Sequence, residues 1–532
     1  MKYSFLLAAG AFALATGAAP AAAQMTNMPG MSMPAPAKKA EPRKKKKPAK
    51  PVKAAARKTA PAPAHKHAAK KEGAPSNPAV KNDGAPSAHE SMSMAMPGAD
   101  VHEQHGTMPA QQPGEPMAMP MPQGHSPADH AGMGPMAMPA SGHMAHEMAM
   151  TGALGPYPMQ RESSGTAWQP DESAHVGAMS MSGRWTLMAH GVLNLVYDHQ
   201  SGRRGDDKAF ASGMLMGMAQ HPLGNGTVQL KAMLSPDPLM GPRGYPLLLA
   251  SGETANGRDR LIDRQHPHDL FMELAGSVSQ KIGPRSSLFV YAGLPGEPAF
   301  GPPAFMHREA IMDSPEAPIT HHWLDSTHIS FGVLTGGIVL DQVKIEASRF
   351  NAREPDQHRW DIETGPLDST AVRVSWNPAR TLSLQGSWGH FVDPEQLEPG
   401  VDQKRWSASA LWADDVAPGW KAAATLAWGR KTAHGHSDDA FAAEGSLKHA
   451  GWTIFGRAEM AENRELTQLE HGPSYRVGKA SVGAVRDFGI AEHLSLGAGG
   501  LVSVNRVPDA LAPLYGGNSP AGAMGFVRLK LD

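Results

Sequence analysis

From Arg184 onward, apolar and polar residues alternate in short segments. In RWTLMAHGVLNLVYD, one parity carries Trp185, Leu193 and Tyr197, whereas the other carries His190 and Asn194. Alternation with a period of two is typical of β-strands that have one apolar face. The segments WKAAATLAW and WSASALW repeat the pattern, with a tryptophan at each end of the apolar face. The pattern predicts an all-β fold.

The position of the tryptophans indicates that these strands cross a membrane. Trp420 and Trp428 share a face, and eight residues of a tilted strand rise about 20 Å, which is close to the height of the apolar band of an outer-membrane barrel. Opposite faces carry charge, for example Lys344 with Glu346 and Arg457. Polar residues toward a lumen and apolar residues toward lipid predict a transmembrane antiparallel outer-membrane β-barrel in contact with outer-membrane lipid.

The alternating segments predict about sixteen strands, with an error of about two. They are expected at 184–198, 207–219, 226–235, 268–282, 285–295, 327–337, 340–350, 368–377, 381–391, 404–413, 419–430, 437–448, 451–461, 475–489, 492–505 and 520–531. Short connections such as GPRS and NPAR alternate with long ones such as 236–266 and 296–326, as periplasmic turns alternate with extracellular loops. An even number of strands places both ends of the barrel on the short-turn side, and therefore an N-terminal tail in the periplasm.

The composition before residue 184 is different. Residues 1–23 have the pattern of a secretory signal peptide, with Lys2, an apolar stretch and three alanines before Gln24. Residues 24–90 are rich in Pro, Ala and Lys, and residues 91–183 are rich in Met and His. With almost no aromatic or β-branched residues, both are predicted to be disordered, and residues 184–532 to form the barrel. The basic run is interpreted as a solvated linker, or alternatively as a contact to anionic envelope polymers.

The Met and His residues of the tail are candidate copper ligands. Thioether sulfur is a soft, uncharged ligand that selects Cu(I) and Ag(I), whereas imidazole suits Cu(I) and Cu(II). The chain has no cysteine, so thiolate sites are excluded. The alternatives are low-complexity drift and an oxidisable methionine reserve. The predicted tail ligands are Met92, Met94, Met96, Met117, Met119, Met121, His125, His130, Met133, Met136, Met138, His143, Met144, His146, Met148 and Met150.

Two further sets of candidate ligands lie in the predicted barrel. One set follows the strands and faces the lumen if the leucines between its members face lipid; the opposite orientation would make these methionines ordinary lipid-facing residues. Its members are Met188, His190, Met214, Met216, Met218 and Met233. The other set lies in the two longest loops, where surface or hydrogen-bonded histidines are the alternative to a metal site. Its members are His266, His268, His307, His321 and His322.

The segments MSMAMPG, MAMPMPQGHS and HMAHEMAM, together with the barrel pattern, resemble the outer-membrane copper-resistance proteins of the B type. The loop sequences RQHPHDLF and PGEPAFGPPAFMHRE look more like a separate, related group. The resemblance implies export, sequestration or permeability control of copper ions, Cu(I) and Cu(II), with periplasmic copper proteins as partners and no organic cofactor. Nucleic acid is not expected as a partner of a secreted chain. No catalytic motif such as G-x-S-x-G or H-E-x-x-H occurs, so an enzyme is not predicted. The alternative function is a porin or uptake channel for another solute, with the tail as a tether.

Overall fold

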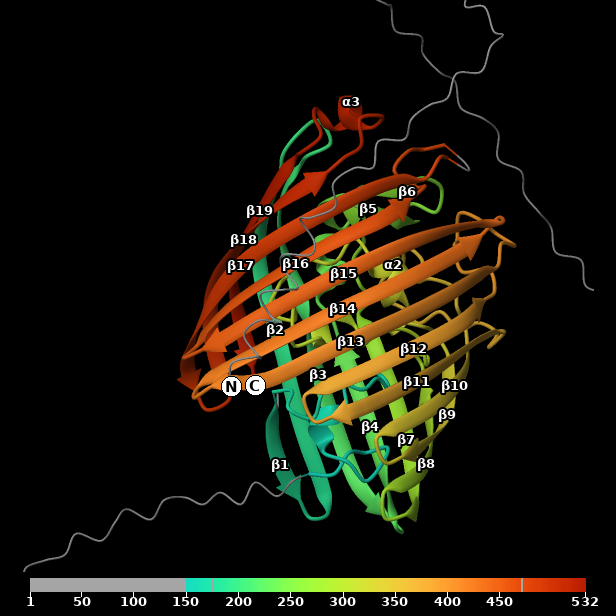
Figure 1. The fold of residues 1–532 in the computed structure, drawn as a ribbon, viewed down its shortest axis with the longest axis vertical. Coiled ribbons are helices and arrows are strands. Elements are labelled where there is room, and N and C mark those ends of the chain that lie inside the picture. Colours follow the sequence, from blue (N-terminus) through green and yellow to red (C-terminus); the bar gives the residue numbers. More distant parts are fainter. Residues whose placement is uncertain (1–149, 175–176, 470–471) are drawn as a thin grey trace, which may run out of the picture. The chain divides into compact units, whose positions relative to one another are not determined.

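The computed structural model describes residues 150–174, 177–469 and 472–532. Within these ranges the chain is mostly β-strand (Figure 1). The strands are β1 (Ala178–Ser182), β2 (Trp185–Gln200), β3 (Asp207–Leu223), β4 (Gly226–Leu234), β5 (Tyr245–Thr254), β6 (Arg260–Gln265), β7 (Phe271–Gly283), β8 (Ser286–Gly293), β9 (Val333–Leu340), β10 (Val343–Phe350), β11 (Ser369–Ala379), β12 (Leu382–Phe391), β13 (Gln403–Ala417), β14 (Trp420–Ala433), β15 (His436–His449), β16 (Trp452–Asn463), β17 (Tyr475–Ala491), β18 (Leu494–Arg506) and β19 (Ala521–Leu531).

Seventeen of the strands in the described ranges belong to one antiparallel sheet, and this sheet closes on itself. Closure is achieved by β19, whose residues pair with Gly191–Gln200 of β2. β1 pairs with the same strand, along the first residues of β2 from Trp185 to Ala189. The other sixteen strands form the barrel, which confirms the predicted strand number. A closed barrel leaves no unpaired sheet edge, so its backbone groups need no water inside a bilayer.

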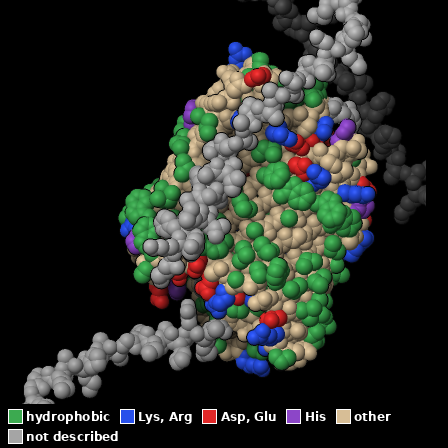
Figure 2. Space-filling model, viewed as in Figure 1, with side chains coloured by type: hydrophobic (Ala, Val, Ile, Leu, Met, Phe, Trp, Pro, Cys, Tyr) green, Lys and Arg blue, Asp and Glu red, His purple; other side chains and the backbone are tan. Residues whose placement is uncertain are grey.

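The two faces of the wall follow the predicted alternation. Outward side chains such as Leu195, Leu215 and Trp406 are about half exposed, and Figure 2 shows hydrophobic side chains spread over the wall between groups of charged ones. Inward side chains are polar and buried: Lys344 and Arg373 both contact Glu346, at 3.1 Å and 2.9 Å. The exposed surface is therefore apolar and the interior charged, which is the arrangement of an outer-membrane barrel.

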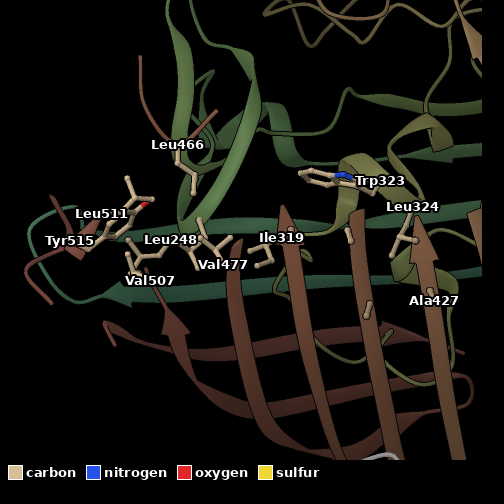
Figure 3. Packing of buried hydrophobic residues seen from close by; sticks show 14 residues of the cluster. Leu248, Ile319, Trp323, Leu324, Ala427, Leu466, Val477, Val507, Leu511 and Tyr515 are labelled. Atoms are coloured by element: carbon tan, nitrogen blue, oxygen red, sulfur yellow. The ribbon is translucent and has the colours of Figure 1, made fainter. Parts of the chain in front are cut away.

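The lumen is filled by the two longest loops. The loop between β4 and β7 contains η2 (Asp237–Met240) and the separate hairpin β5–β6, in which nearly every residue of β5 is buried. The loop between β8 and β9 contains η3 (Phe305–His307), α2 (His321–Leu324) and η4 (Ser326–His328). Leu248 of the hairpin and Trp323 of α2 belong to one apolar cluster with residues of the wall (Figure 3). Predicted strand 327–337 therefore begins later, at Val333, because its first residues turn into η4.

A third segment enters the barrel from the short-turn side. Residues 150–174, which include η1 (Met159–Arg161), carry buried side chains such as Tyr157 and Trp168. The carbonyl of Gly165 accepts a hydrogen bond from Lys231, and the carbonyl of Thr166 accepts one from Lys344. The prediction that residues 91–183 are disordered is therefore wrong for 150–174 and for β1. Inward-facing cations supply donors for the segment's backbone, a contribution that composition alone does not reveal.

Ion pairs attach the loops to the wall. Arg308, which follows η3, has a fully buried guanidinium that donates two hydrogen bonds of 2.8 Å to Glu444 of β15. The same guanidinium donates to Asp325, at 2.5 Å.

α3 (Ala512–Tyr515) lies in the loop between β18 and β19. None of the helices in the described part of the chain is long and apolar enough to cross a membrane.

Candidate metal centre in the barrel lumen

Sheet register brings the predicted lumen methionines together. His190 of β2 pairs with Met216 of β3, and Met216 pairs with Met233 of β4. All three side chains are buried, with exposed fractions of 7%, 3% and 3%, whereas Leu215, which precedes Met216 on β3, is 54% exposed. Directly paired side chains on one face lie about 5 Å apart at Cβ. The lumen orientation of these methionines is therefore confirmed, and their lipid-facing alternative is wrong.

One polar contact in this row joins a nitrogen and a sulfur. His190 Nε2 lies 3.2 Å from Met216 Sδ. Met214, Met216, Met233 and Met272 form one buried cluster, against which Met218 and Met306 pack. We call these six methionines with His190 and His307 the thioether cluster. Met188 faces the same side of β2 and is half-buried beside Gly177, with Met218 as its cross-strand partner.

A β-bulge adds a methionine that the alternation did not indicate. The register of β4 with β7 shifts between Met233, which pairs with Glu273, and Leu234, which pairs with Phe271. Met272 is the additional residue, and both Met272 and Glu273 are buried. A bulge places two consecutive residues opposite one residue of the partner strand and re-aims a side chain. Strict alternation predicts that only one of the two faces the lumen, so the burial of Met272 in this cluster was missed.

His307 reaches the thioether cluster from η3 rather than forming part of a loop site. Its ring centroid lies 5.8 Å from that of His190. Burial, together with the neighbouring His190 and Lys231, lowers the pKa of His307 to about 3, so the imidazole is neutral at physiological pH. Its Nε2 is buried without a hydrogen-bond partner. A neutral imidazole and several thioethers are the donor types that a soft monovalent ion such as Cu(I) prefers.

The other four predicted loop histidines meet around α2. Ring centroids of His266 lie 5.9 Å from His321 and 5.6 Å from His322, and His321 and His322 are 5.5 Å apart. His268 lies 6.4 Å from His266. His328 joins them at 5.1 Å from His268 and 5.2 Å from His321. We call these five residues the histidine cluster; its members come from two loops that are distant in sequence.

Acceptors hold the rings of the histidine cluster in place. His268 Nδ1 lies 2.8 Å from Asp237, His321 Nδ1 lies 2.8 Å from Asp325, and His328 Nδ1 lies 2.7 Å from the carbonyl oxygen of Asp325. Burial lowers the pKa of His321, and burial with the neighbouring His268 and His321 lowers the pKa of His328 further. These two imidazoles are therefore neutral.

His266 and His322 have carboxylate partners. His266 Nε2 lies 3.0 Å from Glu253, and burial lowers the pKa of His266 to about 4, so this contact is a hydrogen bond from a neutral ring rather than an ion pair. Burial acts in the same direction on His322, but Glu354, at 3.0 Å, outweighs it and raises the pKa of His322 to about 9. His322 is therefore a cation at neutral pH.

The tail ligands from Met92 to Met148 lie outside the described residues. Met150 is described, and its carbonyl accepts a hydrogen bond from the backbone of Met159. In residues 150–174, 177–469 and 472–532, no three His, Asp or Glu side chains are arranged so that they could hold a metal ion together. A depression of about 490 Å³ near Tyr197, Val482 and Gly525 lies on the outer wall and is separate from both clusters.

No family model and no curated protein matches the chain. Several solved outer-membrane proteins are similar in fold. OmpF of Salmonella typhi, in complex with daunomycin, is 11% identical with a TM-score of 0.42, covering 66% of this chain and 100% of that chain. The anion-selective porin from Comamonas acidovorans is 11% identical with a TM-score of 0.38, covering 65% and 100%. OmpT of Vibrio cholerae is 8% identical with a TM-score of 0.38, covering 66% and 100%. The closed sixteen-stranded topology itself defines the chain as an outer-membrane-type β-barrel.

Proposed function

We propose that this protein is a non-enzymatic, copper-binding outer-membrane barrel that contributes to copper tolerance by sequestering or exporting copper ions. The observation that carries the proposal is the contact of His190 with Met216 at 3.2 Å, inside a buried cluster of thioethers that also contains His307. Lumen positions of porin-type barrels are normally polar, so a group of methionines there needs a reason. Soft-ion binding supplies one.

The tail and the lumen would act in sequence. In the proposed orientation the tail lies in the periplasm, where its Met and His blocks collect Cu(I) or Cu(II), delivered by periplasmic copper proteins. Covalent attachment raises the effective concentration of these blocks at the barrel, so transfer to the thioether cluster does not require high affinity at any single site. The segment 150–174 connects the two, because it continues from the last Met/His block into the lumen.

The uptake-channel alternative is disfavoured by the filled lumen. The barrel interior contains fully buried Arg308, Arg373 and Arg457, and the segment 150–174 covers the short-turn side. A general porin needs a continuous water-filled path. In the described residues, Arg308 of the loop between β8 and β9 and the segment 150–174 lie inside the barrel and are bonded to its wall.

The test is Ag(I) and Cu(I) binding to the full chain in detergent, with Met214, Met216 and Met233 changed together to leucine. Leucine keeps the volume and removes the sulfur, so folding should be retained. We expect loss of the tightest lumen-bound ion, seen as fewer sulfur neighbours in X-ray absorption, and lower copper tolerance of cells. The matched control is Met524→Leu, since Met524 is equally buried on β19 but lies outside the thioether cluster. Wild-type binding and tolerance in a folded triple variant would refute the lumen site.

A further inference from the structure

We propose that the histidine cluster is a second ion site, at which Nε2 of His268 and Nε2 of His328 bind one soft monovalent ion of the Cu(I) class. This inference rests on the proposed copper function and names a second station for the same ion. It differs from the sequence-based loop set, because His328 is a ligand and His266, His307 and His322 are not.

Hydrogen bonding fixes which nitrogen of each ring is available. A backbone carbonyl can only accept, so Nδ1 of His328, at 2.7 Å from the carbonyl of Asp325, carries the ring proton. Nδ1 of His268 faces the carboxylate of Asp237 at 2.8 Å and carries its proton for the same reason. Where Nδ1 holds the single ring proton, Nε2 of the same ring presents a bare lone pair.

These two lone pairs are buried and unused. Nε2 of His268 and Nε2 of His328 both lack a hydrogen-bond partner among the described residues and are shielded from solvent. The two rings lie 5.1 Å apart at their centroids and are nearly perpendicular, at 77°. Metal-binding histidines usually donate their other nitrogen to a carboxylate or a backbone carbonyl, which orients the ring and raises its basicity. Both types of acceptor are present here.

The remaining histidines are less suited to be ligands. Nε2 of His266 is engaged by Glu253 at 3.0 Å, and His322 is paired with Glu354. His321 lies 5.2 Å from His328 but differs from both proposed ligands, because its Nε2 is not a fully buried nitrogen without a hydrogen-bond partner. Two imidazoles suit a low-coordinate monovalent ion, whereas Zn(II) normally takes four ligands.

The site is connected to the thioether cluster by shared elements. The ring of Phe305 in η3 lies 6.2 Å from that of His268 and 6.5 Å from that of His328. The next two residues, Met306 and His307, belong to the thioether cluster. Ile329, which follows His328, packs against the methionines of that cluster. The two sites therefore lie on neighbouring residues of the same loop.

The decisive experiment is anomalous X-ray diffraction from crystals of the full chain equilibrated with micromolar Ag(I), which is a redox-stable probe for Cu(I). We expect two separate peaks, one among Met216, Met233 and His190, and one between His268 and His328. A peak at the thioether cluster alone would overturn this inference and leave the proposed function intact. A peak at the histidine cluster alone would support the second site and refute the thioether site. Absence of both peaks would refute both.

Variants provide an independent measurement in solution. His328→Gln keeps an amide that can donate to the Asp325 carbonyl but removes the basic nitrogen, so the full chain should bind one Ag(I) ion fewer. His328→Met supplies a soft sulfur in place of nitrogen and should restore binding, with one nitrogen neighbour replaced by sulfur in X-ray absorption. The control His493→Gln changes an exposed histidine far along the chain and should have no effect. Unchanged Ag(I) stoichiometry in folded His328→Gln would contradict the proposal, as would failure of His328→Met to restore binding.

Discussion

Arg308 offers the sharpest test of how the lumen loops are held. Its guanidinium is fully buried, donates two hydrogen bonds of 2.8 Å to Glu444 and also contacts Asp325. Asp325 in turn accepts from His321, so the same ion pair supports the histidine cluster. Burial would raise the pKa of Asp325, but Arg308 outweighs it and holds the pKa well below its usual range. We predict that Arg308→Met destabilises the loop between β8 and β9 without unfolding the barrel.

The magnitude follows from the two carboxylates that the substitution leaves buried. Removing one partner of a buried ion pair typically costs about 3–5 kcal/mol, because the remaining charge is uncompensated. If this cost falls on local opening of the loop, amide protection there should decrease by about two to four orders of magnitude, since ~1.4 kcal/mol corresponds to a factor of ten. The strands, whose hydrogen bonds are closed around the barrel, should keep their protection.

Hydrogen exchange followed by mass spectrometry of peptides from residues 294–332 measures this directly. Arg430→Met is the matched control, because Arg430 pairs with Asp439 at 2.7 Å on the exposed rim, where ion pairs contribute little. Neutralising both carboxylates as well, in Arg308→Met with Asp325→Asn and Glu444→Gln, should recover part of the protection. Exchange of Arg308→Met within tenfold of the wild type would refute the reasoning.

Three further predictions follow from the tail, the titrating histidines and the N-terminal segment. A peptide of residues 88–150 should bind several Cu(I) ions through thioethers, and Met→Leu changes should abolish this binding. Alanine at His125, His130, His143 and His146 should weaken Cu(II) binding more than Cu(I) binding. X-ray absorption that shows only oxygen and nitrogen neighbours would contradict thioether ligation. In the folded chain the pKa of His266 is about 4 and that of His307 about 3, whereas both are near 6.5 in the unfolded chain. Protons therefore favour the unfolded chain, and loop stability, measured by hydrogen exchange, should fall as the pH drops below 6.5. Loops equally protected at pH 7 and pH 4 would refute this. Trp168 is buried and packs edge-on against Tyr157, with ring centroids 5.1 Å apart. Trp168→Ala should therefore destabilise the packing of segment 150–174 by roughly 3–5 kcal/mol and raise conductance in planar bilayers, whereas Trp452→Ala on the exposed wall should not. Equal conductance of both variants would argue against a blocking segment.

Strand alternation was sufficient to predict the barrel. Successive side chains of a strand point to opposite faces of the sheet. If Leu215 faces lipid, Met214 and Met216 on either side of it must therefore face the lumen. For the same reason the sixteen barrel strands and the alternation of short turns with long loops could be read from the sequence. The bulge at Met272 could not, since a bulge breaks the periodicity on which such a prediction depends.

What the sequence by itself determined is the wall, whereas the contents of the lumen were decided by tertiary structure. His268 and His328 are sixty positions apart and meet only because two loops fold inward. The sequence groups His307 with the loop histidines, but η3, to which it belongs, places it beside His190 instead. Residues 150–174 have the composition of a disordered chain, yet inward-facing Lys231, Lys344 and Arg373 supply donors that hold them. Contacts of this kind form only when the loops and the N-terminal segment fold into the barrel, which brings distant side chains together, and no local pattern records those contacts.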